Sequence, residues 1–507
     1  MQKHLILDPL YGFIELSGEE AIVAYSPPVM RLANIKQLGF SYFKYPLATH
    51  TRWSHSIGVA YLMKKACQYI NSNLNRAFFN ADDVKVAGLI GLLHDLGHGP
   101  LSHSLGILMR SMFRYRRKYD VELTNEYVNN QLRKEYLRDY LKGMGLEDGK
   151  EDEGENLIDN IFGRRIGERV RGILSKDIDE LDEKDRVIKD MIDSDADLDR
   201  IDYLARDSYF TIQGRTLNVE ALLKNMILVR DDRGDRRFGY HRNACLYLES
   251  LLMLRNLLYA EVYEEENRAI ADIMFSHAVY AHCHRQAEGS DELLRKYLKD
   301  FVKMPDCEAL VYLRIFGDDY EKEIIRRLLL QKPYKVAYKI SFYDMVKEEG
   351  NRDILKFVLK ACRDWRFDFE KWRRFELDIT NRMIGEAVRG GKWRGHYPAI
   401  FVYLNMRDEV LRALSSFVLE QDSLEQNIRV EAEHLLGELK RTIEIYLADR
   451  PEGNARRIDE ILPYITYLDR SLLARTYLYV AYDDEYIEKE NESEVVKAFK
   501  EEARSYS

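Results

Sequence analysis

The 507-residue sequence has few cysteines and no long apolar run. Its five cysteines lie far apart and form no Cys-x-x-Cys pair, which excludes a disulfide framework or zinc ribbon and fits a reducing compartment. No apolar stretch approaches the roughly 20 residues that cross a bilayer. The first 12 residues are short and contain a proline, unlike a signal peptide. We therefore expect a cytoplasmic protein without a membrane segment.

An excess of positive charge is also lacking. The chain has 77 Lys and Arg against 86 Asp and Glu, a formal net charge of −9. This excludes a general affinity for nucleic acid, although local basic patches remain open. Because 46% of the residues are apolar, the chain can bury a large core. Its length suggests two or three domains, or one large helical unit with an appendage.

The apolar pattern predicts a mainly α-helical fold with small β-hairpins. Apolar residues at helical spacing predict a core-facing helix over 56–70, and the apolar run 86–93 predicts a buried one. Residues 5–17 and 227–240 have the alternation and turn residues of hairpins. From residue 246 onward, nearly all of the chain has the pattern of helices.

The most informative stretch follows the buried helix, where His94 and Asp95 stand side by side before Gly97 and His98. Burying an imidazole and a carboxylate together is costly unless something compensates them. A divalent metal ion does so, since both groups are ordinary metal ligands. The alternative is a helix C-terminus with a histidine near the dipole and Gly-Pro ending the helix. The dipeptide alone leaves both interpretations open.

A second informative stretch is the acidic run 193–207. Like charges this dense repel one another, so a cation or arginine partners are expected nearby. If the chain is helical from Asp199, then Asp199, Tyr203 and Asp207 lie along one face. The alternative is an acidic helix N-terminus with Arg200 and Arg206 in surface pairs.

Together, His55, the His94–Asp95 pair and Asp199 occur in the order found in HD-domain metal-dependent phosphohydrolases. The sequence resembles the dNTP triphosphohydrolase branch, which includes the sterile-alpha-motif-and-HD protein and bacterial dGTPase-like enzymes. Residues 8–12, 35–39, 50–59, 94–103 and 199–207 carry the resemblance, with a weaker match at 255–263. It fades after about residue 340. The resemblance implies an HD helical core with its extension over 1–340 and a helical C-terminal region of unknown role over 341–507.

The resemblance also implies the residues of the site. His55, His94, Asp95 and Asp199 would hold one divalent ion, and the sequence does not choose among iron, manganese, zinc, nickel and magnesium. Further Mg²⁺ could accompany the substrate phosphates. The reaction would release a deoxynucleoside and inorganic triphosphate. Phosphates would be held by Arg52, Arg200 and Arg255, the sugar 3′-hydroxyl by Gln37 and Asp207, and the rest of the nucleoside by Tyr203, Tyr263 and Leu38. For each arginine the alternative is a surface cation, and for each tyrosine a core residue.

The sequence departs from the family where a proton donor is expected. The family carries a Thr-His-Glu histidine paired with an aspartate, and here these positions are Asn125 and Gly106. An amide cannot act as a general acid, a role worth ~100-fold to ~10,000-fold. His98, His103 or Glu126 could replace it, and we prefer His98; otherwise water serves, or the reaction is slow or absent. The alternative for His98 is a structural hydrogen bond to a ligand. With Asp199, His98 and His103 complete the predicted catalytic set.

The segment 360–394 mixes lysines and arginines with Trp365, Trp372, Phe375 and Trp393. Such a mixture could bind single-stranded nucleic acid. Because acidic residues are interleaved, we favour a solvated amphipathic helix. Members of the family are often dimeric or tetrameric, so the resemblance also implies a homo-oligomer.

The sequence therefore leaves three functions open. The first is hydrolysis of deoxynucleoside triphosphates. The second is an HD phosphohydrolase acting on another phosphoester, such as a nucleoside monophosphate or a phosphodiester, which the missing histidine motivates. The third is a non-catalytic nucleotide sensor or scaffold, against which the intact metal quartet argues.

Overall fold

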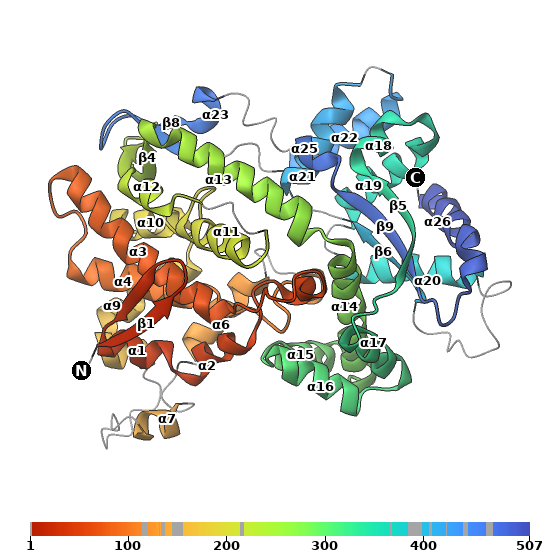
Figure 1. Ribbon diagram of the computed structural model, residues 1–507, viewed down its shortest axis with the longest axis horizontal. Coiled ribbons are helices and arrows are strands. Elements are labelled where there is room, and N and C mark those ends of the chain that lie inside the picture. Colours follow the sequence, from red (N-terminus) through yellow and green to blue (C-terminus); the bar gives the residue numbers. More distant parts are fainter. Residues whose placement is uncertain are drawn as a thin grey trace.

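The computed structural model describes residues 3–113, 119–130, 132, 137–143, 156–212, 217–365, 368–383, 398–404, 408–421, 423–439, 445–462 and 470–506. Helices dominate these residues, and three small sheets lie among them (Figure 1). The predicted mainly helical class is confirmed. No helix in the described part of the chain is both long enough and apolar enough to cross a membrane.

The helices up to α14 include α3 and α11, which carry predicted metal ligands. Their bounds are α1 Gly18–Ala24, α2 Pro27–Met30, α3 Arg52–Leu74, α4 Ala81–Leu93, α5 Gly106–Phe113, α6 Tyr119–Asn130, α7 Arg138–Gly143, α8 Leu157–Phe162, α9 Arg164–Ser175, α10 Glu183–Asp190, α11 Leu198–Phe210, α12 Val219–Lys224, α13 Cys245–Leu258 and α14 Glu266–Gln286.

Most of the later helices lie in the right-hand half of Figure 1. Their bounds are α15 Asp291–Val302, α16 Asp306–Phe316, α17 Asp319–Leu329, α18 Phe342–Lys347, α19 Arg352–Asp364, α20 Phe369–Met383, α21 Asp408–Leu419, α22 Gln426–Glu438, α23 Ile458–Ile461, α25 Arg470–Leu473 and α26 Glu492–Tyr506.

The predicted hairpins and buried helices are present. β1 His4–Asp8 pairs antiparallel with β2 Gly12–Leu16, and β3 Met226–Arg230 pairs antiparallel with β4 Arg236–His241. The helices predicted over 56–70 and 86–93 are parts of α3 and α4. These two pack closely because Gly91 lies against the backbone of Ala60, where an added Cβ would come within 2.7 Å of the Ala60 Cα.

The prediction of nearly continuous helix after residue 246 is wrong at five strands. β5 Lys335–Ser341, β9 Tyr477–Tyr482 and β6 Ile400–Leu404 form an antiparallel sheet in the order β5-β9-β6. β7 Tyr446–Ala448 and β8 Arg456–Arg457 extend the β3–β4 sheet. Short apolar runs such as β9, which is almost fully buried, cannot be distinguished from buried helix by periodicity alone.

Two large apolar clusters form the core. One runs from Ile14 to Tyr334 and includes a few later side chains, such as Phe401 and Leu447. The other contains residues between Ile340 and Ala503. The predicted metal ligands lie on α3, on α11 and just after α4, so the first cluster is the scaffold that positions them.

Candidate active site

Helix ends place the predicted metal ligands. Thr51 and Ser54 form a reciprocal capping box at the start of α3, which puts His55 in its first turn. His94 is the residue at which α4 ends, and Asp95 follows. Asp197 accepts a 2.7 Å hydrogen bond from the Arg200 amide, which caps α11 and places Asp199 in its first turn. Three segments far apart in sequence therefore meet at one point.

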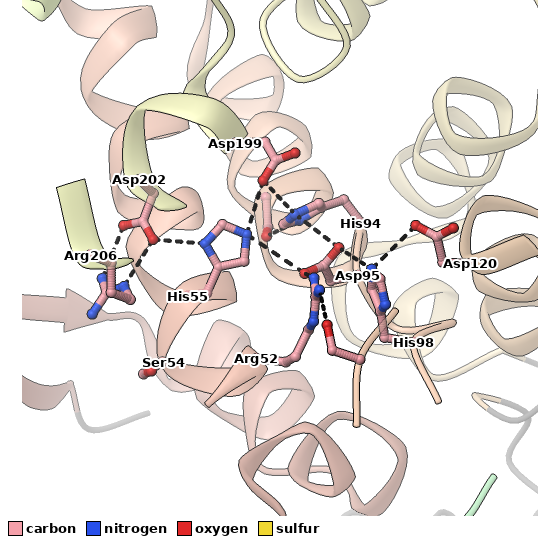
Figure 2. A network of polar contacts seen from close by, with 12 residues as sticks. Arg52, Ser54, His55, His94, Asp95, His98, Asp120, Asp199, Asp202 and Arg206 are labelled. Atoms are coloured by element: carbon pink, nitrogen blue, oxygen red, sulfur yellow. Dashed lines mark hydrogen bonds and ion pairs between the residues drawn. The ribbon is translucent and has the colours of Figure 1, made fainter. Parts of the chain in front are cut away.

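The four predicted ligands converge, as Figure 2 shows. His55 Nε2 lies 3.0 Å from Asp199 Oδ1 and 3.6 Å from Asp95 Oδ2. His94 Nε2 lies 3.6 Å from Asp199 Oδ1 and 3.5 Å from Asp95 Oδ1. Ligand atoms of His55, His94 and Asp95 all lie within 4.8 Å of one another.

The chemistry of this donor set fits a divalent metal ion. The Nε2 atoms of His55 and His94 are buried, and neither makes a well-formed hydrogen bond within the described residues. Buried polar atoms normally have partners. Two imidazole nitrogens facing two carboxylates are a common ligand set for a transition metal, so the cluster could hold such an ion.

Electrostatics at the cluster favour charged carboxylates. Burial alone would lower the pKa of His55, but Asp199 and Asp202 beside it raise that pKa to about 10. Burial likewise opposes ionisation of Asp95, yet Arg52 and the adjacent histidines hold the pKa of Asp95 well below its usual range. Without a bound metal ion, the protonated form of the histidines and the ionised form of the carboxylates are therefore both favoured.

A series of buried polar residues holds the Nδ1 side of the His55 ring, opposite the ligand cluster. Its Nδ1 lies 2.7 Å from Asp202 Oδ2. Arg206 donates to both oxygens of Asp202, at 2.9 and 3.0 Å, and to Asp8 Oδ2 at 2.8 Å. Gly58 leaves room for this chain, because a Cβ there would lie 2.1 Å from Asp202 Oδ1. Asp8, Asp202 and Arg206 occur in the matched stretches, but the sequence analysis gave them no role in the site.

Arg52, predicted to bind phosphate, contacts one of the predicted metal ligands directly. Its Nη1 donates to Asp95 Oδ2 at 2.5 Å, and its Nη2 donates to Ser102 Oγ and lies 3.1 Å from His103 Nε2. Arg52 is buried while His103 is exposed. The guanidinium therefore lies between the ligand cluster and the surface.

His98, the preferred proton donor, lies beside the ligands. Its Nε2 is 3.3 Å from Asp95 Oδ1 and 3.2 Å from Asp120 Oδ2 on α6. Its ring meets that of His103 edge-on, with centroids 4.8 Å apart. Asp120 is thus a partner of His98 that was not predicted from the sequence. Glu126, the third candidate donor, instead forms an ion pair with Lys299 at 2.7 Å.

A second group of predicted residues gathers around Asp207. Its Oδ1 lies 2.7 Å from His50 Nε2, and its Oδ2 accepts a 2.5 Å hydrogen bond from the Tyr263 hydroxyl. The backbone N–H of Gln37 donates to the His50 carbonyl at 3.0 Å, and the side-chain Oε1 atom of Gln37 is buried. Leu38 is also buried. The sequence analysis did not give His50 a role.

The remaining predicted substrate residues lie near these two groups. Arg200 is held by Asp197 at 3.3 Å and Asp195 at 3.5 Å. The ring of Tyr203 is 6.5 Å from that of Tyr263. Arg255, on α13, is buried and its guanidinium lies 5.8 Å from the ring centroid of Tyr259.

Comparison with known proteins identifies the scaffold. Residues 52–207 match the HD domain model, and residues 243–358 match the model of the HD associated region. An uncharacterized protein of Methanocaldococcus jannaschii is 28% identical over 341 residues, which cover 67% of this chain and 61% of that protein. The deoxynucleoside triphosphate triphosphohydrolase SAMHD1 of Danio rerio is 42% identical over 96 residues, 19% of this chain and 15% of the relative.

Most of the chain also resembles a solved structure. A phosphohydrolase of Bacteroides thetaiotaomicron has a TM-score of 0.59 at 19% identity, covering 94% of this chain and 99% of the other. At this identity the likeness concerns the fold alone. The site found above, with ligands on α3, on α11 and after α4, lies within the matched range 52–207. The chain therefore contains a segment that matches the HD domain, followed by a segment that matches the HD associated region.

Proposed function

We propose that the protein is a metal-dependent hydrolase that converts deoxynucleoside triphosphates to deoxynucleosides and inorganic triphosphate. The observation that carries the proposal is the convergence of His55, His94, Asp95 and Asp199. Arg52 contacts Asp95, and Arg200 and Tyr203 lie on the same helix as Asp199. The similarity over 96 residues to a relative named as a deoxynucleoside triphosphate triphosphohydrolase supports the choice of substrate.

A divalent ion bound there would lower the pKa of a coordinated water to about 7 and polarise a phosphoryl oxygen. The protein's own residues would bind and orient the substrate. Arg52, Arg200 and Arg255 would neutralise the phosphates, since a planar guanidinium matches phosphate oxygens. Asp207 and Gln37 would accept or donate hydrogen bonds at the sugar 3′-hydroxyl. Tyr203 would pack against the sugar and leave no room for a 2′-hydroxyl.

We assign proton delivery to His98. It lies between Asp95 and Asp120, which would orient its ring. From there it would protonate the oxygen that leaves with the deoxynucleoside. Because Asn125 replaces the family's histidine, a different phosphoester is the second candidate substrate.

Product identification tests the proposal. The purified protein is incubated with each deoxynucleoside triphosphate and Mn²⁺, and products are separated by ion-exchange chromatography. We expect deoxynucleoside and triphosphate in equal amounts, and no turnover by the Asp199→Ala variant. Release of monophosphate or diphosphate would reject the reaction. Turnover of a phosphodiester or a nucleoside monophosphate alone would favour the second substrate class, and tight binding without turnover would favour a sensor.

A further inference from the structure

A small pocket lies in the C-terminal region and is lined by residues of α19, α20 and α26 and by Trp365. Its volume is about 240 Å³, and no residue of the metal cluster lines it. The lining contains three cations, Lys360, Lys371 and Arg374, and three aromatic residues, Phe357, Trp365 and Tyr506. It therefore joins two kinds of side chain that the proposed hydrolysis at the HD site does not use.

The aromatic side of the pocket is held rigidly. The rings of Trp365 and Tyr506 meet edge-on at 4.8 Å, and those of Trp365 and Phe357 at 5.8 Å. Trp372 donates a 3.0 Å hydrogen bond from Nε1 to the Trp365 carbonyl. Trp365 and Phe357 are both buried. These contacts fix an apolar wall of rings set nearly perpendicular to one another, against which the base of a ligand can pack.

The cationic side of the pocket has carboxylates close to it, but they lie outside the lining. The charge of Asp364 interacts with those of Lys360 and Lys371, and the charge of Asp378 interacts with that of Arg374. Lys371 and Arg374 are exposed, one turn apart on α20, and Lys360 is half-buried on α19. No carboxylate is among the described residues that line the pocket. Nearby Asp364 accepts hydrogen bonds from Arg363 at 2.7 and 3.0 Å. Lys371 lies 3.6 Å from Asp368, in an exposed pair of the kind that contributes little stability.

A neighbouring cavity is less suited to an anion, because its lining carries charges of both signs. It is larger, about 570 Å³, and shares Arg374 with the first pocket. Its other cations, Arg295 and Arg373, are offset by three carboxylates, Asp291, Asp368 and Glu370. An anion entering this cavity would meet as many negative groups as arginines. Of the two cavities, only the smaller one is lined by charged residues of a single sign within the described part of the chain.

We propose that the smaller pocket binds one mononucleotide, with its base against Trp365 and its phosphate on Lys371 and Arg374. Stacking on an aromatic ring accepts any base, and clustered cations suit a phosphate. The volume lies just below the ~300–1,000 Å³ of sites for larger ligands, which fits a single nucleotide rather than a dinucleotide. The acidic residues along α20 argue against an extended strand. This site is independent of the proposed hydrolysis.

This proposal is tested by measuring the binding of dAMP to the full-length Asp199→Ala variant. Calorimetry and tryptophan fluorescence report the binding. In that background we expect the added Lys371→Ala and Arg374→Ala changes to weaken dAMP binding at least tenfold. Lys497→Ala, on α26 and exposed away from the pocket, should leave it unchanged. Deoxyadenosine should bind at least tenfold more weakly than dAMP. Both altered side chains are exposed, and circular dichroism checks that the variant folds.

Three results would overturn the proposal. The first is an absence of dAMP binding to the Asp199→Ala protein. The second is equal dAMP affinity in the Lys371→Ala, Arg374→Ala protein, also seen with Arg374→Glu as a second variant. The third is tight binding of a 20-residue oligothymidylate that depends on these two cations while dAMP does not bind, which would assign the surface to a single-stranded nucleic acid.

Discussion

Asp202 Oδ2 lies 2.7 Å from the Nδ1 atom of His55, on the side of the ring opposite the ligand cluster. An imidazole held in this way keeps its Nε2 directed at a metal ion and becomes a better donor. Arg206 holds both oxygens of Asp202 and connects them to Asp8 in the N-terminal hairpin. The orientation of one ligand thus depends on residues from β1, α3 and α11.

Replacing Asp202 by Asn should therefore weaken metal binding by about 10-fold to 100-fold, the usual effect of removing such a partner. The measurement is a competition titration of Mn²⁺ against a fluorescent chelator. Asp232→Asn, the same change at an exposed residue of the turn after β3, serves as the control. Equal Mn²⁺ affinity in both variants would mean that Asp202 does not position His55.

Metal binding should depend steeply on pH. In the metal-free protein the neighbouring carboxylates raise the pKa of His55 to about 10, so a metal ion must displace a proton at neutral pH. Affinity for Mn²⁺ should rise with pH, about tenfold per unit for each proton released. Calorimetry in buffers of different ionisation enthalpy counts these protons, and a count of zero would contradict the assignment.

The same shift predicts the opposite trend for the stability of the metal-free fold. A His55 proton is bound more tightly in the folded protein than in the unfolded chain, where histidine titrates near 6.5. Its stabilising contribution is therefore complete below about pH 6.5 and is lost as the pH rises towards 10. Urea unfolding in the presence of EDTA measures this loss.

His98→Gln should lower kcat by ~100-fold to ~10,000-fold with an unchanged metal content, if His98 is the general acid. The defect should shrink with a substrate whose leaving group is already a weak base, such as a p-nitrophenyl ester, because such a group departs without a proton. A purely structural histidine would give the same loss on both substrates. The ratio of the two losses therefore distinguishes the roles.

His50→Gln should affect recognition of the sugar. His50 holds Asp207 at 2.7 Å, and Tyr263 holds the other oxygen, so the carboxylate has a fixed orientation toward the sugar. Losing one hydrogen bond to a charged group costs about 1.5–3 kcal/mol. We expect KM for a deoxynucleoside triphosphate to rise about tenfold or more, with little change for the 2′,3′-dideoxy analogue. Equal changes in KM for both would separate His50 from 3′-hydroxyl recognition.

The sequence contains local signals for the residues of the cluster, whereas their convergence follows from the fold. His94 and Asp95 end an apolar helix, and the dense acidic run requires cations or arginines nearby. Arg206 and Arg200 do pair with Asp202 and Asp197. The alternative in which these arginines form surface pairs is wrong for Arg206, which is fully buried.

What the sequence does not predict depends on contacts between distant segments. Asp120 reaches His98 only because α6 packs beside the loop that follows α4, where Gly97 leaves room for the α6 backbone. Likewise, β9 is recognised as a strand only through its pairing with β5 and β6. The tryptophans of the 360–394 segment give no pocket by spacing alone. Trp365 and Trp372 contribute to the core beside α26, while Trp393 lies outside the described residues.

The central claim is that His55, His94, Asp95 and Asp199 bind one shared divalent ion. Metal content of the purified protein, measured by inductively coupled plasma mass spectrometry, tests it most directly when compared with single alanine variants of His55, His94, Asp95 and Asp199. We predict one divalent ion per chain in the parent protein and loss of that ion in each folded variant. A parent protein that binds no divalent ion after incubation with Mn²⁺, Fe²⁺ or Zn²⁺, or four variants that all retain it, would contradict the account.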